Sequence, residues 1–386
     1  MRENSVAPFW GKATLNALMA AGVISVIAGQ AYAASGDWPM LNYDRAGTRH
    51  NRYETILNAQ NVNALQLAWQ VDIGDVYSSP VVADGVLFIP AGYKLYALNA
   101  MTGATIWATT LHYSVATSPA VANGIVYVTD SGVLTALDAE TGTILWNQLP
   151  DPPAGGYGSN PIVDGSRVFV EDSDGSLYAY IARSGVRLWK VPAIVGCPIN
   201  SIPAIAQGIV YTQNLAGIYA LDIKTGRYLW SQRFGVSSGS PVVRGGFVYA
   251  QTGDSVAAFD AKTGTKKWAA GFENNGAKDG GFAITRNHLF ATFLEQPAIW
   301  DFKTKSGQFK SKQEEAPFAP SPTFANDVLY TVSTAGVSAY DAKSMKQLWI
   351  GKFDNKYPYT SPVVSHGMVY AVSGSKGSLH AYALRN

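Results

Sequence analysis

Residues 136–146 read ALDAETGTILW, and close copies occur at 97–107 (ALNAMTGATIW) and 220–230 (ALDIKTGRYLW). The tryptophan that closes the motif recurs at intervals of about 40 residues, a period typical of propellers and related repeat arrays. Phe309 falls in phase where one tryptophan is missing. The tryptophans that follow the period are Trp69, Trp107, Trp146, Trp189, Trp230, Trp268 and Trp349.

A second marker follows each aromatic residue and also occurs eight times. Between the markers, short apolar runs alternate with Asn-Gly and Asp-Gly turns, a pattern that predicts β-hairpins. Each unit reads as four short strands, so the sequence predicts an all-β fold, an eight-bladed β-propeller of four-stranded blades. The markers are Ser79-Pro80, Ser118-Pro119, Ser159-Asn160-Pro161, Ser201-Ile202-Pro203, Ser240-Pro241, Gly281-Phe282-Ala283, Ser321-Pro322 and Ser361-Pro362.

The residue types of the repeated motif are suited to an interface between neighbouring blades. The aspartate can accept hydrogen bonds from backbone N–H groups of its own turn, and the glycine can take a positive φ. The tryptophan predicts a docking ring between neighbouring blades, and the alanine two residues before the aspartate is expected to leave space for it. Two units depart from the motif, with Lys305 and Met345 in place of glycine, and their interfaces are expected to be weaker.

The order of the markers predicts how the ring closes. Trp69 precedes the first Ser-Pro, and the last unit has no tryptophan strand of its own. A strand near 65–73 should therefore complete the last blade and remove its open edge. We expect an N-terminal extension at 34–63 and one propeller domain at 64–386.

The first 33 residues predict a cleaved export signal. Arg2 and Lys12 form a basic region, residues 17–28 are apolar, and Ala31-Tyr32-Ala33 is a cleavage site. An N-terminal membrane anchor is the alternative, but spanning a bilayer takes about 20 apolar residues. The mature protein is thus expected to be periplasmic or secreted, without a transmembrane segment.

Charge and cysteine content narrow the function classes. The formal net charge of +2 gives no excess of positive charge with which to bind the phosphates of nucleic acid. Cys197 is the only cysteine, which excludes an intrachain disulfide and leaves its role open. We expect a monomer.

Candidate binding residues precede the Ser-Pro markers, where the chain should enter the innermost strands at one mouth of the channel. Aromatic rings with a few charges suit a small-molecule or peptide site, although the tyrosines could simply fill the axis. The mouth candidates are Tyr77, Tyr113, Tyr157, Tyr359, Lys278 and Lys356. Weaker candidates for oxygen ligands to Ca²⁺ are Glu273, Asn275 and Asp279.

The motif A-x-D-x-x-T-G-x-x-x-W, together with Asp37-Trp38-Pro39, Tyr43, Arg49 and the run from Asn61 to Trp69, resembles the PQQ-type eight-bladed propellers. This family includes quinoprotein alcohol dehydrogenases and the BamB lipoprotein of outer-membrane assembly. The resemblance implies a propeller fold, and it allows a PQQ and Ca²⁺ site. It covers nearly all of residues 37–384 and does not by itself decide an activity.

The chain departs from the dehydrogenase pattern at three places. Where the family has a vicinal disulfide, this chain has Thr117-Ser118, and where the family has an acidic residue before the first blade's proline, it has Tyr77. Where the family has its catalytic aspartate motif, this chain has Gly235-Val236-Ser237-Ser238-Gly239. The lipidated N-terminal cysteine of BamB has no counterpart either. No catalytic residue can therefore be assigned, and the cofactor is unknown.

Three functions remain in consideration. The preferred interpretation is an exported scaffold, without catalysis, that binds a protein or a small ligand in the cell envelope. The alternatives are a PQQ-dependent dehydrogenase that oxidises an alcohol or sugar at a non-standard site, and a BamB-like assembly component.

Overall fold

The structure is a computed structural model that describes residues 36–115, 117–149, 158–193, 201–234, 239–252, 255–271, 281–293, 296–301, 306–308, 320–353, 360–374 and 377–385. For 292–293, 296–301 and 306–308 only the backbone is described. The described residues belong to one compact unit, Tyr32–Asn386. None of the helices in these ranges is long and apolar enough to cross a membrane.

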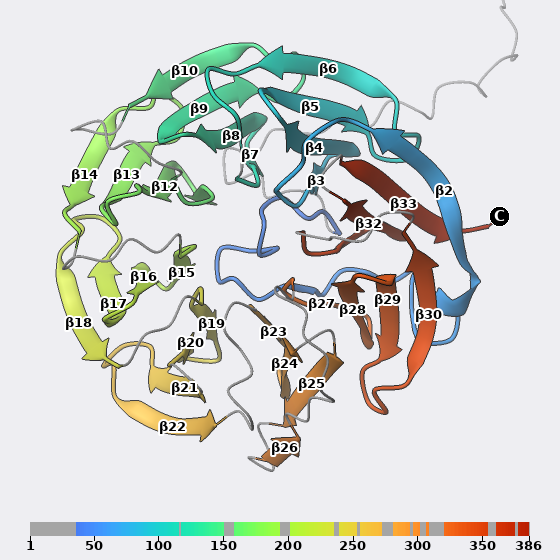
Figure 1. The fold of residues 1–386 in the computed structure, drawn as a ribbon. Helices are drawn as coiled ribbons and strands as arrows, with labels where there is room; N and C mark the ends of the chain where they lie inside the picture. The colour runs from blue at the N-terminus through green and yellow to red at the C-terminus, as the bar shows by residue number, and fades with distance from the viewer. Residues whose placement is uncertain are drawn as a thin grey trace, which may run out of the picture. The chain divides into compact units, whose positions relative to one another are not determined.

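The described strands form sheets arranged around a common centre (Figure 1). We number the sheets in chain order, and within each sheet successive strands run antiparallel from the centre outward. Sheet 1 contains β3 (Val81–Ala83), β4 (Val86–Ala91), β5 (Lys94–Asn99) and β6 (Thr105–Thr110). Sheet 2 contains β7 (Ala120–Ala122), β8 (Ile125–Asp130), β9 (Val133–Asp138) and β10 (Ile144–Gln148). Sheet 3 contains β11 (Ile162–Asp164), β12 (Arg167–Glu171), β13 (Leu177–Ile181) and β14 (Arg187–Val191).

The second half of the chain repeats this order. Sheet 4 contains β15 (Ala204–Ala206), β16 (Ile209–Asn214), β17 (Gly217–Asp222) and β18 (Tyr228–Arg233). Sheet 5 contains β19 (Val242–Arg244), β20 (Phe247–Gln251), β21 (Ser255–Asp260) and β22 (Lys266–Gly271). Sheet 6 contains β23 (Phe282–Ile284), β24 (His288–Phe293), β25 (Gln296–Asp301) and β26 (Ser306–Gln308). Sheet 7 contains β27 (Thr323–Ala325), β28 (Val328–Ser333), β29 (Gly336–Asp341) and β30 (Gln347–Lys352).

The prediction of an all-β propeller of four-stranded blades is confirmed, but the predicted number of eight such blades is wrong. In the part of the chain that the structure describes, seven sheets have four strands, and sheet 7 has five. Its fifth strand is β1 (His50–Asn51), which pairs parallel to β27 with His50 opposite Phe324. The fifth strand forms because the N-terminal segment, although distant in sequence, passes close enough to β27 for their backbones to pair.

The predicted closure of the ring is confirmed in sheet 8. This sheet contains β31 (Val363–Ser365), β32 (Met368–Ser373), β33 (Ser378–Leu384) and, outermost, β2 (Leu65–Asp72). In β2, Trp69 lies opposite Ala381 of β33. A short 3-10 helix, η1 (Val62–Ala64), leads into β2. The two ends of the propeller thus share one sheet, which leaves β33 without a free edge.

In the described part of the chain, tryptophans join neighbouring sheets, as predicted, whereas Phe309 lies outside the described residues. The indole Nε1 of Trp107 donates to the carbonyl of Ala139 at 3.1 Å, and that of Trp69 donates to the carbonyl of Ala100 at 3.1 Å. A Cβ added at Gly142 would lie 2.6 Å from the Trp107 ring, so the neighbour's indole rests on the turn glycine. The space predicted at the alanine serves another purpose, because Ala136 lies opposite Trp146 of its own sheet.

The D-x-x-T-G turn has the predicted geometry. Asp138 Oδ1 accepts hydrogen bonds from the backbone N–H groups of Glu140 and Thr141 and from the Thr141 hydroxyl. These bonds, first that of the Thr141 N–H, hold the pKa of Asp138 below its usual range. Gly142 has φ +71°, and Met345 takes φ +56° at the position where glycine was expected. The turn therefore persists in sheet 7 at the cost of placing a side chain in the left-handed region.

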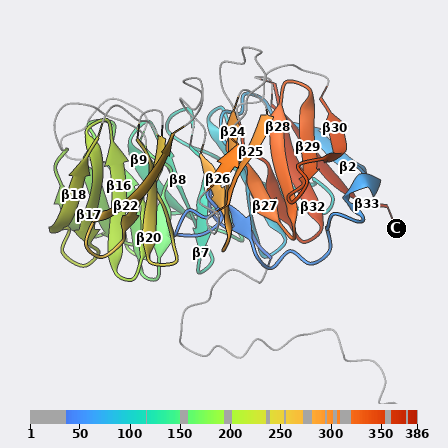
Figure 2. The ribbon, with the colours of Figure 1, turned by 90° about the horizontal axis from the view of Figure 1, so that it is seen from below.

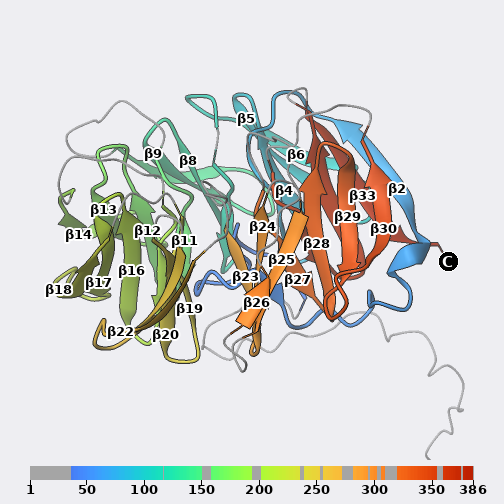
Figure 3. The same cartoon turned by 60° about the horizontal axis from the view of Figure 1, so that its bottom comes forward.

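The N-terminal residues 36–51, which we call the hub segment, contact the innermost strand of every sheet. This segment, in blue, lies near the centre of the ring in Figure 1 and at one end of the sheets in Figures 2 and 3. Its carbonyl groups accept hydrogen bonds from the same position of successive strands. The contacts, in chain order, are Val82 N to Trp38 O, Val121 N to Pro39 O, Ile205 N to Arg45 O, Val243 N to Ala46 O, Ile284 N to Thr48 O and Phe324 N to Arg49 O. Arg45 also pairs with Asp164 of sheet 3.

Asn51 completes the circuit of the hub segment. It is fully buried, and its Nδ2 donates to Gly36 O and to Val364 O of β31, both at 2.9 Å. The end of the hub segment at Asn51 is therefore bonded both to sheet 8 and to the start of the segment at Gly36, which lies next to sheet 1. Residues 36–51 of the expected N-terminal extension thus lie at the centre of the propeller.

Candidate functional site

Three tyrosines are exposed on loops of sheet 1. Tyr77 precedes β3, Tyr93 lies in the turn between β4 and β5, and Tyr113 follows β6. Their exposed fractions are 47%, 61% and 50%. We call these three residues the tyrosine patch. Two of them, Tyr77 and Tyr113, are mouth candidates that the sequence predicted, whereas Tyr93 was missed because it follows a hairpin glycine rather than preceding a Ser-Pro marker.

Backbone hydrogen bonds tie the three loops together. Gly92 N donates to Asp75 O at 2.8 Å, Leu111 N donates to Tyr93 O at 2.8 Å, and Val115 N donates to Gly92 O at 2.9 Å. The loop that carries Tyr113 is also held by sheet 2, because Asp130 Oδ2 accepts from its N–H group at 3.1 Å. Asp130 is buried, and burial raises its pKa. The patch is thus preorganised by its backbone.

The other predicted site residues lie outside the described residues. These are Tyr157, Tyr359, Lys278 and Lys356 at the mouth, Glu273, Asn275 and Asp279 as calcium ligands, and Cys197. Within the described ranges, no group of three or more His, Cys, Asp or Glu side chains could hold a metal ion. Tyr77 and Tyr113 are therefore the predicted mouth residues whose positions can be compared.

The residues at the quinone positions do not fit that cofactor. Thr117 and Ser118 are both buried, and the Thr117 hydroxyl donates to Thr129 O at 2.7 Å. The Thr117 hydroxyl is thus engaged within the fold, and neither residue can form a disulfide. Tyr77 offers a phenol where the resemblance calls for a carboxylate that could approach a metal ion. No reaction step through PQQ follows from these side chains.

Arg49 is a buried cation in the hub segment. Its side chain is 5% exposed, and its Nη1 atom has no hydrogen-bond partner in the described structure. Burial lowers the pKa of Arg49 to about 9. A Cβ added at Gly281 would lie 3.7 Å from Arg49 Nε. That position lies closer still to the Ser321 side chain, so Gly281 leaves room for this serine.

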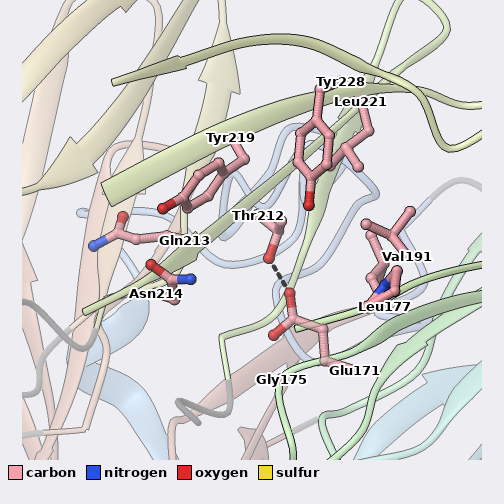
Figure 4. A pocket seen from close by; sticks show the side chains of 11 residues that line it. Glu171, Gly175, Leu177, Val191, Thr212, Gln213, Asn214, Tyr219, Leu221 and Tyr228 are labelled. Atoms are coloured by element: carbon pink, nitrogen blue, oxygen red, sulfur yellow. Dashed lines mark hydrogen bonds between the residues drawn. The ribbon is translucent and has the colours of Figure 1, made fainter. Parts of the chain in front are cut away.

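A pocket lies between sheets 3 and 4 (Figure 4). Its atom-free space is about 380 Å³, part of which is open solvent. We call it the sheet 3–4 pocket. Its walls combine aliphatic side chains, two tyrosines and a cluster of polar groups. The lining residues are Glu171, Gly175, Leu177, Val191, Pro192, Thr212, Gln213, Asn214, Tyr219, Leu221 and Tyr228.

Glu171 is the one carboxyl group in this lining. It ends β12, is 4% exposed, and accepts a hydrogen bond from the Thr212 hydroxyl of sheet 4. Its backbone is fixed as well, since its N–H donates to Ser159 Oγ at 2.8 Å. Desolvation raises the pKa of Glu171 well above its usual range, so the isolated site favours the neutral acid.

Sequence reasoning missed Glu171, although a signal existed. The residue two positions after the aromatic of the second strand is Thr129 in sheet 2, Gln213 in sheet 4 and Gln251 in sheet 5. Sheet 3 has Glu171 at this place, two residues after Phe169. An ionisable side chain at a position that is buried and neutral in the other sheets is expected to have a shifted pKa, which makes it a candidate for a functional site.

Known proteins share this architecture. The solved structure of a europium-containing methanol dehydrogenase matches with a TM-score of 0.76 at 16% identity, covering 91% of this chain and 98% of that one. BamB from Moraxella catarrhalis matches with a TM-score of 0.66 at 17% identity, covering 83% of this chain and 99% of that one. At such identities these likenesses show the fold alone.

Sequence comparisons add a family. The 1-butanol dehydrogenase (cytochrome c) of Thauera butanivorans is 30% identical over 197 residues, which are 49% of this chain and 24% of that relative. The match thus spans about a quarter of the relative's length. A family model described as outer membrane protein assembly factor BamB matches residues 57–193 and 182–386. Because these matches cover most of its length, the chain belongs to this family of PQQ-type propellers.

Proposed function

We propose that the protein is a binding scaffold of the cell envelope that recognises a partner protein, without catalysis, through the tyrosine patch. The observation that carries this proposal is the patch itself, three exposed tyrosines on loops that backbone hydrogen bonds lock together. Tyrosine is enriched at protein interfaces because it offers a large apolar surface and a polar tip with little conformational entropy to lose.

Preorganisation supports binding over a purely structural role. Side chains that merely fill an axis would be buried, whereas Tyr77 and Tyr113 each expose about half of their surface. Since the loops are held by main-chain bonds and by Asp130, little ordering entropy is lost when a partner docks. The membership in a family described by an assembly factor is in keeping with a partner protein.

The location that we propose is the periplasm, or the medium after secretion, for a monomer released from a signal at 1–33. The basic residues, the apolar stretch and the Ala31-Tyr32-Ala33 site support this. A BamB-like role in outer-membrane assembly is a more specific form of the same proposal.

Site-specific photocrosslinking tests the proposal. A photoreactive phenylalanine analogue is placed at Tyr77 or Tyr113 and, as a matched control, at Tyr53, which is 53% exposed on the N-terminal chain. We expect a discrete adduct from the patch positions but not from Tyr53, and loss of that adduct in the Tyr93→Ala background. Identical adducts from all three positions, or none from the patch, would contradict the proposal.

A PQQ-dependent dehydrogenase is the second candidate, favoured by the sequence likeness to the Thauera enzyme. It is tested independently by adding PQQ and Ca²⁺ to the purified protein. Quinone absorbance that stays with the protein, accompanied by dye-linked oxidation of an alcohol or sugar, would establish catalysis. Absence of both, under conditions that reconstitute a known quinoprotein, would remove this candidate.

A further inference from the structure

We propose that the sheet 3–4 pocket binds a primary ammonium group, supplied by a lysine side chain of a partner protein. The inference rests on the proposed protein-binding function and adds a second recognition point to it. Glu171 would pair with the ammonium group, and the walls would cover the aliphatic stem. Each step below follows from the residues that line the pocket.

The charge of the lining selects a cation. Among the eleven lining residues, Glu171 is the one acid, and no lysine, arginine or histidine accompanies it. One carboxyl oxygen of Glu171 accepts a hydrogen bond from the Thr212 hydroxyl. An anionic ligand would meet this carboxyl group without any compensating positive charge, whereas an ammonium group supplies three donors to it.

The shape of the lining selects a cation on an aliphatic stem. Leu177, Val191 and Leu221 are apolar walls beside the carboxyl group. Figure 4 shows the hydroxyl of Tyr228 directed toward Thr212 and Glu171, whereas the hydroxyl of Tyr219 points toward Gln213. The two rings meet edge to face, with centroids 6.2 Å apart. A lysine buries its methylene groups against such walls while its charge reaches the polar end, where tyrosine faces add a cation–π attraction.

One end of the sheet 3–4 pocket lies on the same side of the ring as the tyrosine patch. Tyr93 lies in the turn after the second strand of sheet 1, and Gly175 lies in the corresponding turn of sheet 3. Because the sheets share one topology, equivalent turns emerge at the same end of the strands. A partner that covers the tyrosine patch on sheet 1 can therefore reach this end of the pocket along the same face of the ring.

Binding of an ammonium group would be coupled to proton release. In the free protein, burial raises the pKa of Glu171 and so favours the neutral acid, whereas a cation beside it favours the carboxylate. The other ionisable groups that line the pocket are Tyr219 and Tyr228, and burial raises the pKa of Tyr228 to about 12, so it stays neutral. The affinity for an ammonium ligand is thus expected to rise with pH until Glu171 ionises without it.

Calorimetry on the full chain tests this with two small probes, Nα-acetyl-lysine methylamide and its uncharged analogue Nα-acetyl-norleucine methylamide. We expect the lysine probe to bind with a dissociation constant on the order of 1 mM and the norleucine probe at least about tenfold more weakly. Titrations in buffers of different ionisation enthalpy should show the release of a proton with the lysine probe. This measurement needs no variant and so does not depend on the folding of a mutant.

Variants then locate the site. Glu171→Gln should weaken the lysine probe by about tenfold or more and abolish the proton release. Glu140→Gln, a change in an exposed turn of sheet 2, should leave both unchanged. Equal binding of the two probes, equal binding to Glu171→Gln, or no saturable binding of the lysine probe would each overturn the inference. The adducts at Tyr77 and Tyr113 do not involve Glu171, so such a failure would leave the proposed function standing.

Discussion

The indole Nε1 of Trp146 in sheet 2 donates to the carbonyl oxygen of Ala182 in sheet 3 at 3.1 Å. The hydroxyl of Tyr127, also in sheet 2, donates to the same oxygen at 3.1 Å. The carbonyl of Ala182 thus accepts two hydrogen bonds from the neighbouring sheet. The ring centroids of Tyr127 and Trp146 lie 6.0 Å apart. This arrangement makes the tryptophan a polar as well as an apolar link between sheets.

Replacing this tryptophan should destabilise the propeller. Trp146→Ala removes a half-buried ring and its hydrogen bond, and we expect the free energy of unfolding to fall by about 2–4 kcal/mol. Urea unfolding measures the loss. The neighbouring Leu145 is exposed, so Leu145→Ala should change the free energy of unfolding by less than about 0.5 kcal/mol. Similar losses for both variants would contradict the docking role.

Two glycines of sheet 2 separate backbone strain from docking. Gly142 and Gly124 have φ of +71° and +73°, but only Gly142 carries the Trp107 ring, whereas nothing lies within 4 Å of a Cβ at Gly124. Gly124→Ala should cost about 1–2 kcal/mol from the left-handed backbone alone. Gly142→Ala should cost about 1–3 kcal/mol more, because the indole must move. Equal thermal midpoints for the two variants would show that the ring does not press on the glycine.

The hub segment should depend on Asn51. Asn51→Ala removes the amide that donates to Gly36 O and Val364 O in a fully buried position. Leaving these carbonyls unpaired should lower the free energy of unfolding by about 1–3 kcal/mol. Asn147 is exposed on β10, and Asn147→Ala is the matched control, with an expected change below about 0.5 kcal/mol. The hypothesis fails if denaturant titration finds the two variants equally stable.

Glu171 should make stability fall with rising pH. Its pKa is raised in the folded protein, while in the unfolded chain it titrates near pH 4.3, so the folded state holds a proton that the unfolded state has lost. Above about pH 4.3 this reduces the free energy of unfolding by up to roughly 1.4 kcal/mol per pH unit, until the folded group ionises too. Below about pH 4.3 both states are protonated, and the penalty disappears.

Glu171→Gln isolates this contribution because glutamine does not titrate and can still accept from Thr212. We expect the free energy of unfolding of the variant to rise relative to that of the natural protein as the pH is raised above about 4.3, with the two converging near pH 4. Urea unfolding at several pH values measures the difference. A difference that is constant with pH would show that Glu171 is not protonated in the folded protein.

The sequence alone determined the blade, its turns and the closure of the ring. The reason is that the motif around Asp138 and Gly142 is local and repeated, so each copy reports the same hydrogen-bonded turn and the same docking ring. Trp69 ahead of the first Ser-Pro, with no tryptophan in the last unit, likewise placed β2 beside β33. These features follow from spacing along one chain, which a sequence displays directly.

Only the tertiary structure decided the hub and the pocket. The fifth strand of sheet 7 forms because His50 and Asn51 pair with residues of β27, which are far away in the sequence. No short-range sequence pattern predicts that pairing. Glu171 meets Thr212 and Tyr228 only because sheets 3 and 4 pack side by side. Both depend on contacts between residues distant in sequence, and a single sequence records the chemistry of such residues but not which of them become neighbours.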